Sequence, residues 1–188
     1  MKKPSALLVT ISRYKKVTRV LRDLKADHDF PGIKLDVEPA ADFDDVPRLM
    51  RTPDLDLIAL DGHGRDYGES AYFGLHCEEL FCPEYLRGSD GAGIVAPIIV
   101  LGFCCGGKDP FISALEGSLG RSNAAFLGST KETGFRDAED IYLPILRLLP
   151  ELGSTPDPAT AHARLATVAP GIGEAWRSVL LSRRNDPR

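Results

Sequence analysis

Short apolar segments recur along the chain, separated by stretches with helical periodicity. These segments are rich in Val, Ile and Leu and occupy residues 6–11, 33–37, 55–60, 97–103 and 124–127. Three of them, LLVTI, LDLIAL and PIIVLGF, are almost continuously apolar instead of alternating. Continuous apolar runs are typical of strands that are covered on both faces. The pattern therefore predicts a buried and largely parallel sheet.

The stretches between these segments place apolar residues on one face of a helix. We expect helices over residues 14–25, 44–50, 111–119 and 137–149. Because strands and helices alternate along the chain, we predict an α/β fold. The expected architecture is a three-layer α/β/α sandwich with a mostly parallel central sheet.

Two regions interrupt this alternation. In the first, we expect AYFGLH to form a hairpin or edge strand, CEELFCPEYL a short helix and RGSDGAG a loop. In the second, the turn-rich linker GSTPDP follows the last predicted helix. We therefore predict a main domain over residues 1–152, followed by a linker and C-terminal helical extension over 153–188. The segment AWRSVLLSRR is expected to be a docking helix.

Composition and charge narrow the function classes. With 43% hydrophobic and 27% charged residues, the chain is long enough for one substantial core. Its net charge of -4 provides no basic field for nucleic acid or an anionic membrane surface. No apolar run approaches the roughly 18 residues of a membrane-spanning helix, and the N-terminal run is too short for a signal peptide. We expect a cytoplasmic protein without nucleic-acid or membrane partners.

The four cysteines do not have the spacing of a metal site. Cys77, Cys82, Cys104 and Cys105 form neither a CxxC pair nor a Cys/His quartet. A disulfide-built secreted scaffold normally contains far more cysteine for its length. We therefore expect free thiols in a reducing compartment, no bound metal and no cofactor.

A histidine and a cysteine each follow one of the predicted strands. His63 lies between two glycines after DLIALD, and Cys104 precedes Cys105 and two glycines after PIIVLGF. In open α/β sheets, functional sites form beyond the carboxyl ends of the strands. Either residue alone is more often structural than catalytic. Their joint position predicts a catalytic dyad, with a thiolate nucleophile beside a general acid/base.

Glycines flank both members of this predicted dyad. Without a Cβ, they let a substrate backbone approach closely and permit turns that aim amide N–H groups at one point. We assign the predicted oxyanion hole to the backbone N–H groups of Gly64 and Cys104.

The order of these features resembles clan CD cysteine peptidases, and most closely the CHAT branch of the caspase-like fold. The resemblance covers residues 4–149 and rests on DLIALDGHG, YFGLHCEELFCPEYL, IIVLGFCCGG and AAFLGSTKETGFRDAEDIYLPILRLL. It implies a hydrolase, a cysteine endopeptidase that cleaves a protein or peptide substrate with His63 and Cys104. Cys104 matches better than Cys105, because one variable residue and then small residues follow the family nucleophile.

The sequence departs from the family pattern beside the nucleophile. Gly102 and Phe103 stand where a small polar residue and alanine are usual, and metacaspases have at the first of these positions an aspartate that holds a basic P1 side chain. We expect the substrate pocket to include Asp61, Gly62, Gly102, Phe103 and Ser129. Asp61 lines this pocket, orients the dyad or simply ends a strand. The resemblance further implies a bacterial stress or defence role and control by a separate regulatory or sensor protein.

Two other functions stay open at this point. One is a catalytically silent caspase-like module that only binds a partner. The other is a glutamine-amidotransferase-like hydrolase, because GFCCGG resembles the nucleophile elbow G-x-C-x-G of that class. Its second element, H-P-E, is missing, since His162 is followed by Ala163 and Arg164.

Overall fold

The computed structural model describes the backbone of residues 2–11, 15–67, 70–76, 79–81, 83–87, 93–131 and 138–184. Within these ranges it describes all side chains except those of residues 15–20, 63–67, 70–76, 79–81, 84, 87 and 138.

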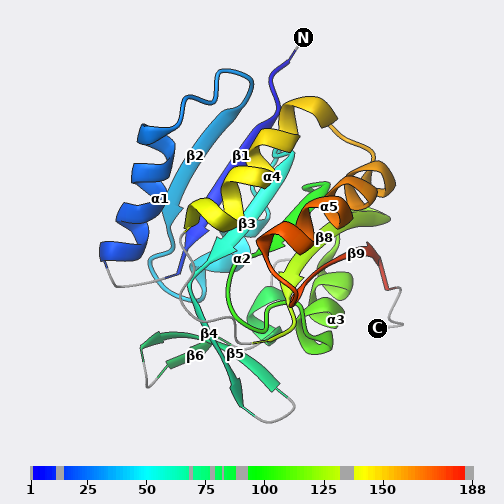
Figure 1. The fold of residues 1–188 in the computed structure, drawn as a ribbon. Coiled ribbons are helices and arrows are strands. Elements are labelled where there is room, and N and C mark those ends of the chain that lie inside the picture. Colours follow the sequence, from blue (N-terminus) through cyan, green and yellow to red (C-terminus); the bar gives the residue numbers. More distant parts are fainter. Residues whose placement is uncertain are drawn as a thin grey trace.

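Six strands form the main sheet in the order β2-β1-β3-β7-β8-β9 (Figure 1). The five predicted strands are all present and parallel to one another: β1 (Ser5–Thr10), β2 (Lys34–Pro39), β3 (Leu57–Asp61), β7 (Ile98–Leu101) and β8 (Asn123–Ser129). The sixth, β9 (Trp176–Ser182), is antiparallel to β8. All residues of β1 and β7 are buried, as continuous apolar runs require.

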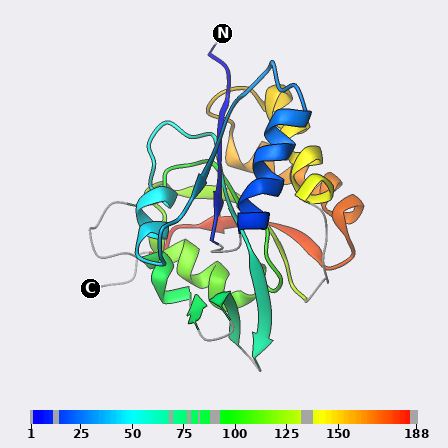
Figure 2. The ribbon, with the colours of Figure 1, turned by 90° about the vertical axis from the view of Figure 1, so that its left-hand side faces the viewer.

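Helices cover both faces of this sheet. On one face lie α1 (Lys15–Asp27), α4 (Ala138–Leu152) and α5 (Pro158–Ile172), and on the other lie α2 (Asp45–Met50) and α3 (Asp109–Ser118) (Figures 1 and 2). The buried side chains divide into two clusters, one on each face of the sheet. The predicted α/β/α sandwich is therefore confirmed.

A second, smaller sheet extends beyond the carboxyl edge of the main one (Figure 1). It is antiparallel and consists of β4 (His63–Tyr67), β5 (Ser70–His76) and β6 (Glu79–Phe81). The prediction of a strand over AYFGLH is confirmed. The prediction of a helix over CEELFCPEYL is wrong in its first half, because Glu79–Phe81 pairs with β5, and only Pro83–Arg87 forms a 3-10 helix, η1. Most of the predicted loop RGSDGAG lies outside the described residues.

The C-terminal part of the chain adds a helix and a strand to the same sheet. Asp157 caps α5 by accepting hydrogen bonds from the N–H and hydroxyl of Thr160, both at 2.9 Å, and Pro158 opens the helix. The predicted docking helix over AWRSVLLSRR is wrong: β9 pairs with β8 along its whole length, from Ser129↔Trp176 to Asn123↔Ser182. The backbone hydrogen bonds of a helix are internal, so a docked helix would leave the edge of β8 unpaired, whereas β9 pairs with it. The division at residue 152 stays a prediction, although both parts share one sheet.

Among the residues that the structure describes, no helix combines the length and the apolar character needed to cross a bilayer.

Candidate active site

Two neighbouring parallel strands bring both members of the predicted dyad to one edge of the sheet. β3 and β7 pair in register from Leu57↔Ile98 to Leu60↔Leu101. His63 and Cys104 each follow the last pair by three residues, so the chain reaches both positions at the same edge. His63 begins β4, where its backbone pairs with Gly74; its side chain lies outside the described set.

The two adjacent cysteines differ in exposure and in backbone conformation. Neither forms a disulfide; Cys104 is partly exposed, whereas Cys105 is fully buried in the apolar cluster beneath α3. The φ of Cys105 is 63°, in the left-handed region that costs a residue with a side chain about 1–2 kcal/mol. Its N–H donates to the carbonyl of Lys131 at 3.2 Å. An external substrate needs an accessible thiol, which favours Cys104 over Cys105.

The glycines around Cys104 are required by contacts within the protein. A Cβ on Gly102 would lie 1.8 Å from the Tyr142 hydroxyl, one on Gly106 2.8 Å from a β7 side chain, and one on Gly107 2.7 Å from the Gly128 carbonyl oxygen. None of these three glycines has a positive φ. Internal packing therefore accounts for their missing side chains without a bound substrate, and the left-handed residue of this turn is a cysteine.

Asp61 ends β3 and is joined to helix α4. The hydroxyl of Tyr142 donates to Oδ1 of Asp61 at 2.9 Å, and this pair packs against Gly102. Burial raises the pKa of Asp61 from 3.8 to about 7, and it outweighs the hydrogen bonds from Tyr142 and from the Gly62 N–H, which lower that pKa. Burial and the neighbouring Asp61 together raise the pKa of Tyr142 well above its usual value. Two residues before His63, the sheet thus holds a carboxyl group that titrates near neutral pH.

This raised pKa makes the stability of the protein depend on pH in a defined direction. The folded protein holds the Asp61 proton more tightly than the unfolded chain does, so the contribution to stability is complete below pH 4 and is lost as the pH rises to about 7. Asp61→Asn keeps an acceptor for Tyr142 but cannot titrate. Between pH 5 and pH 8, the unfolding free energy of the wild type should fall by about 3 kcal/mol more than that of the variant.

Urea unfolding of both proteins at the two pH values measures this difference, and titrations elsewhere in the chain cancel in the comparison. Parallel pH dependences in the two proteins would refute the assignment of the titrating group to Asp61.

The remaining pocket candidates divide between the edge and the interior. Asp61 and Gly62 lie at the end of β3 and keep part of their surface exposed. Phe103 is buried, with its ring edge-on to Phe111 at a centroid distance of 5.3 Å. Ser129 is also buried, and its hydroxyl donates to the Lys131 carbonyl at 2.9 Å. The sheet therefore gathers Asp61, Gly62, Gly102 and Cys104, while the side chains of Phe103 and Ser129 pack inward. Their role in a pocket stays a prediction.

Sequence reasoning missed two residues that contact this edge. Tyr142 lies on the apolar stripe of α4 among aliphatic residues, where only its hydroxyl indicates the need for a polar partner. Arg177 lies on β9, and its guanidinium donates to the carbonyl of Gly107, three residues after Cys104. A separate docking helix, as the sequence predicts for this segment, would not bring Arg177 to the sheet.

The described part of the chain contains no cluster of side chains suited to bind a metal ion. No group of three or more His, Cys, Asp or Glu side chains there could hold a metal ion. Cys77 and Cys82 lie outside the described residues.

Comparison with protein families gives no match to a family model, and no curated protein sequence is similar to this chain. Solved structures do share its fold. A secreted C11 cysteine protease from Bacteroides thetaiotaomicron, in complex with an irreversible peptide inhibitor, matches 90% of this chain with a TM-score of 0.54 and 14% identity. A second structure, of the secreted C11 cysteine protease "iotapain" from the same organism, matches 89% with a TM-score of 0.51 and 12% identity.

The matched regions make up 59% and 62% of those protease chains, so this chain spans about three fifths of their length. At such low identity, the likeness bears on the fold alone. The mostly parallel six-stranded sheet and its two helical layers are those of the caspase-like fold, which this chain shares with C11 cysteine proteases.

Proposed function

We propose that the protein is a cysteine peptidase in which Cys104 is the nucleophile and His63 the general acid/base. The observation that carries this proposal is the register of β3 and β7, in which both residues follow the paired residues Leu60 and Leu101 by three positions. The partial exposure of Cys104 and the fold shared with C11 cysteine proteases support it.

The proposed reaction proceeds through a thioester. His63 takes the proton of the Cys104 thiol, and the resulting thiolate attacks the carbonyl carbon of a peptide bond. The N–H groups of Gly64 and Cys104 stabilise the oxyanion that forms. The carbon–nitrogen bond breaks as His63 donates a proton to the leaving amine. Water then attacks the thioester, His63 takes its proton, and the Cys104 sulfur leaves as the acid product forms.

Three further parts of the proposal rest on the sequence resemblance alone. They are membership of the CHAT branch, a bacterial stress or defence role, and control by a separate regulatory or sensor protein.

The direct test is cleavage of a diverse peptide library under reducing conditions, analysed by mass spectrometry. We expect cleavage at a limited set of P1 residues, and loss of cleavage after treatment with an irreversible, peptide-based thiol reagent. A protein that neither cleaves the library nor reacts with the reagent at Cys104 would contradict the proposal and favour a silent binding module.

A further inference from the structure

Three segments that are distant in sequence lie against one another beside the proposed nucleophile. We call residues 103–107 the nucleophile turn. The N–H of Cys105 donates to the Lys131 carbonyl at 3.2 Å, and that of Gly107 donates to the Ser129 carbonyl at 2.7 Å. The end of β8 is held in turn by the chain entering β9, because the N–H and hydroxyl of Thr130 both donate to the Ala175 carbonyl, at 2.8 and 3.1 Å.

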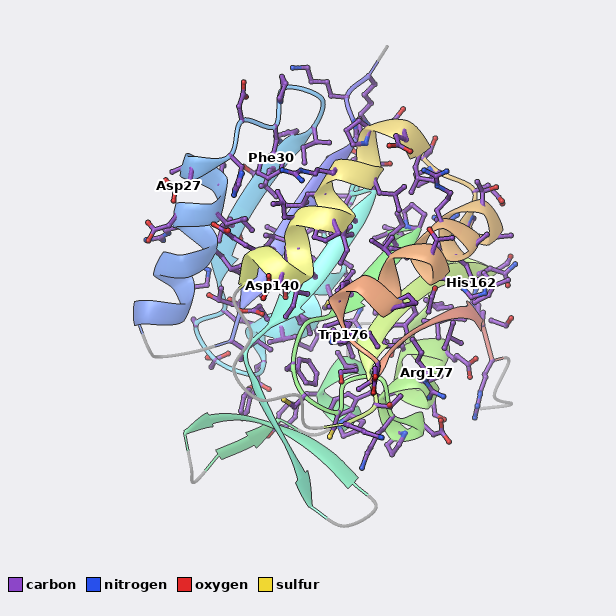
Figure 3. All side chains as sticks on the ribbon, viewed as in Figure 1. Asp27, Phe30, Asp140, His162, Trp176 and Arg177 are labelled. Carbon is purple, nitrogen blue, oxygen red and sulfur yellow. The ribbon has the colours of Figure 1, made fainter. Side chains whose placement is uncertain are left out.

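Arg177 contacts the nucleophile turn directly, and not through the end of β8. Its Nε and Nη2 donate to the Gly107 carbonyl oxygen at 3.1 and 2.7 Å, and Nη2 also donates to Oδ1 of Asp109 at 3.0 Å. The strand that carries it, β9, is two strands away from β7 in the sheet. Figure 3 shows Arg177 next to Trp176 on this strand, close to α3.

A glycine on the intervening strand makes this contact possible. Gly128 lies directly opposite Arg177 in the β8–β9 ladder, and directly opposed residues face the same side of a sheet. A Cβ on Gly128 would lie 3.0 Å from the Gly107 nitrogen, so the turn rests on the strand where a side chain is missing. The Arg177 guanidinium contacts the turn over Gly128, where no side chain intervenes.

We infer that Arg177 is a positioning residue for the proposed peptidase reaction, because it fixes the nucleophile turn through the Gly107 carbonyl. The inference rests on the proposed function. Gly106 and Gly107 have no side chains with which to hold the turn, and glycine loses more conformational freedom on ordering than any other residue. A planar guanidinium that directs two N–H groups at one oxygen restricts that peptide in position and orientation. Small misplacements of reacting groups cost about 10²-fold in rate.

Arg177 could instead act only structurally, by joining the C-terminal segment to α3 through Asp109. A second arginine provides a matched control for this alternative. Arg184 lies on the same segment, and its Nε donates to Oε2 of Glu116 in α3 at 2.7 Å. The two arginine side chains are similarly exposed, at 42% for Arg177 and 55% for Arg184. Of these two arginines, Arg177 contacts the turn. Arg184→Ala removes an ion pair to α3 whose carboxylate is less exposed, at 15% for Glu116 against 90% for Asp109, and leaves the contact between Arg177 and the turn intact.

The experiment compares Arg177→Ala, Arg177→Lys and Arg184→Ala with the wild type. For each protein, kcat and KM are measured on the best library peptide, and the rate of Cys104 alkylation by iodoacetamide is measured at one fixed pH. We expect Arg177→Ala to lower kcat by about 10- to 100-fold at nearly unchanged KM. It should also lower the rate at which iodoacetamide alkylates Cys104, because a displaced turn changes the position of the thiol.

Arg177→Lys keeps the positive charge but has a single donor nitrogen, so its kcat should lie between those of the wild type and Arg177→Ala. Arg184→Ala should match the wild type in kcat and in the rate of Cys104 alkylation.

Equal effects of Arg177→Ala and Arg184→Ala would overturn the inference, as would a loss of kcat fully explained by a smaller folded fraction in circular dichroism. The proposed function fails separately. If the wild type cleaves no peptide but Arg177→Ala still lowers the rate of Cys104 alkylation, the positioning role stands without the peptidase. If the wild type cleaves and Arg177→Ala cleaves equally well, the peptidase stands without the positioning role.

Discussion

Cys104→Ala is expected to lower kcat/KM for peptide cleavage by about 10⁴-fold or more, because the substitution removes the atom that forms the thioester. Cys105→Ala is the matched control, since it deletes the same sulfur one residue further on. Cys105 is fully buried, so its replacement should cost about 1 kcal/mol of stability and leave kcat/KM within a few-fold of the wild type. Steady-state kinetics on the best library peptide and urea unfolding measure both quantities.

The pair of variants also identifies the nucleophile independently of turnover. A peptide-based irreversible reagent should modify the wild type and Cys105→Ala at position 104, as located by mass spectrometry of the digested protein. Full activity in Cys104→Ala, or loss of activity in Cys105→Ala with an intact fold, would transfer the nucleophile assignment to Cys105.

Gly102→Ala is expected to destabilise the protein by about 3 kcal/mol or more. Its Cβ would lie 1.8 Å from the Tyr142 hydroxyl, and 3.2 Å from Oδ1 of Asp61. The tyrosine side chain is fully buried and has no free space into which it could move. Displacing it would also remove the hydrogen bond to Asp61, leaving that carboxyl without a side-chain donor. Urea unfolding at pH 7 measures the loss.

Two further variants separate steric conflict from a general effect of alanine. Gly117 lies in α3 with no atom within 4 Å of its virtual Cβ, so Gly117→Ala should stabilise the protein by up to about 1 kcal/mol. Tyr142→Phe in the Gly102→Ala background removes the nearest clashing atom and should restore part of the lost stability. If Gly102→Ala is as stable as the wild type, the close contact between Gly102 and Tyr142 is wrong.

The central part of the fold follows directly from local patterns in the sequence. Segments such as PIIVLGF are buried on both faces, so they predict strands without knowledge of their neighbours. Their order then places His63 and Cys104 after strands, and the pairing of β3 with β7 brings the two positions to one edge.

The elements that the sequence failed to predict depend on partners elsewhere in the chain. Trp176–Ser182 has apolar residues compatible with either a helix or a strand, and pairing with β8 decides in favour of the strand. The same applies to Glu79–Phe81, a three-residue strand that forms only against β5. The hydrogen bond between Asp61 and Tyr142 joins residues 81 positions apart, and no local pattern links them.

The attachment of the nucleophile turn to β9 has a consequence for the protein during its synthesis. Arg177 follows Gly107 by 70 residues, and a ribosome adding about 5–20 residues per second needs about 4–14 seconds to make that stretch. Throughout this interval the nascent chain contains both His63 and Cys104 but lacks the guanidinium that contacts the nucleophile turn. If the protein is the proposed peptidase and Arg177 its positioning residue, we expect a nascent or C-terminally truncated chain to be a poor catalyst, with full activity only once the last strand has joined the sheet.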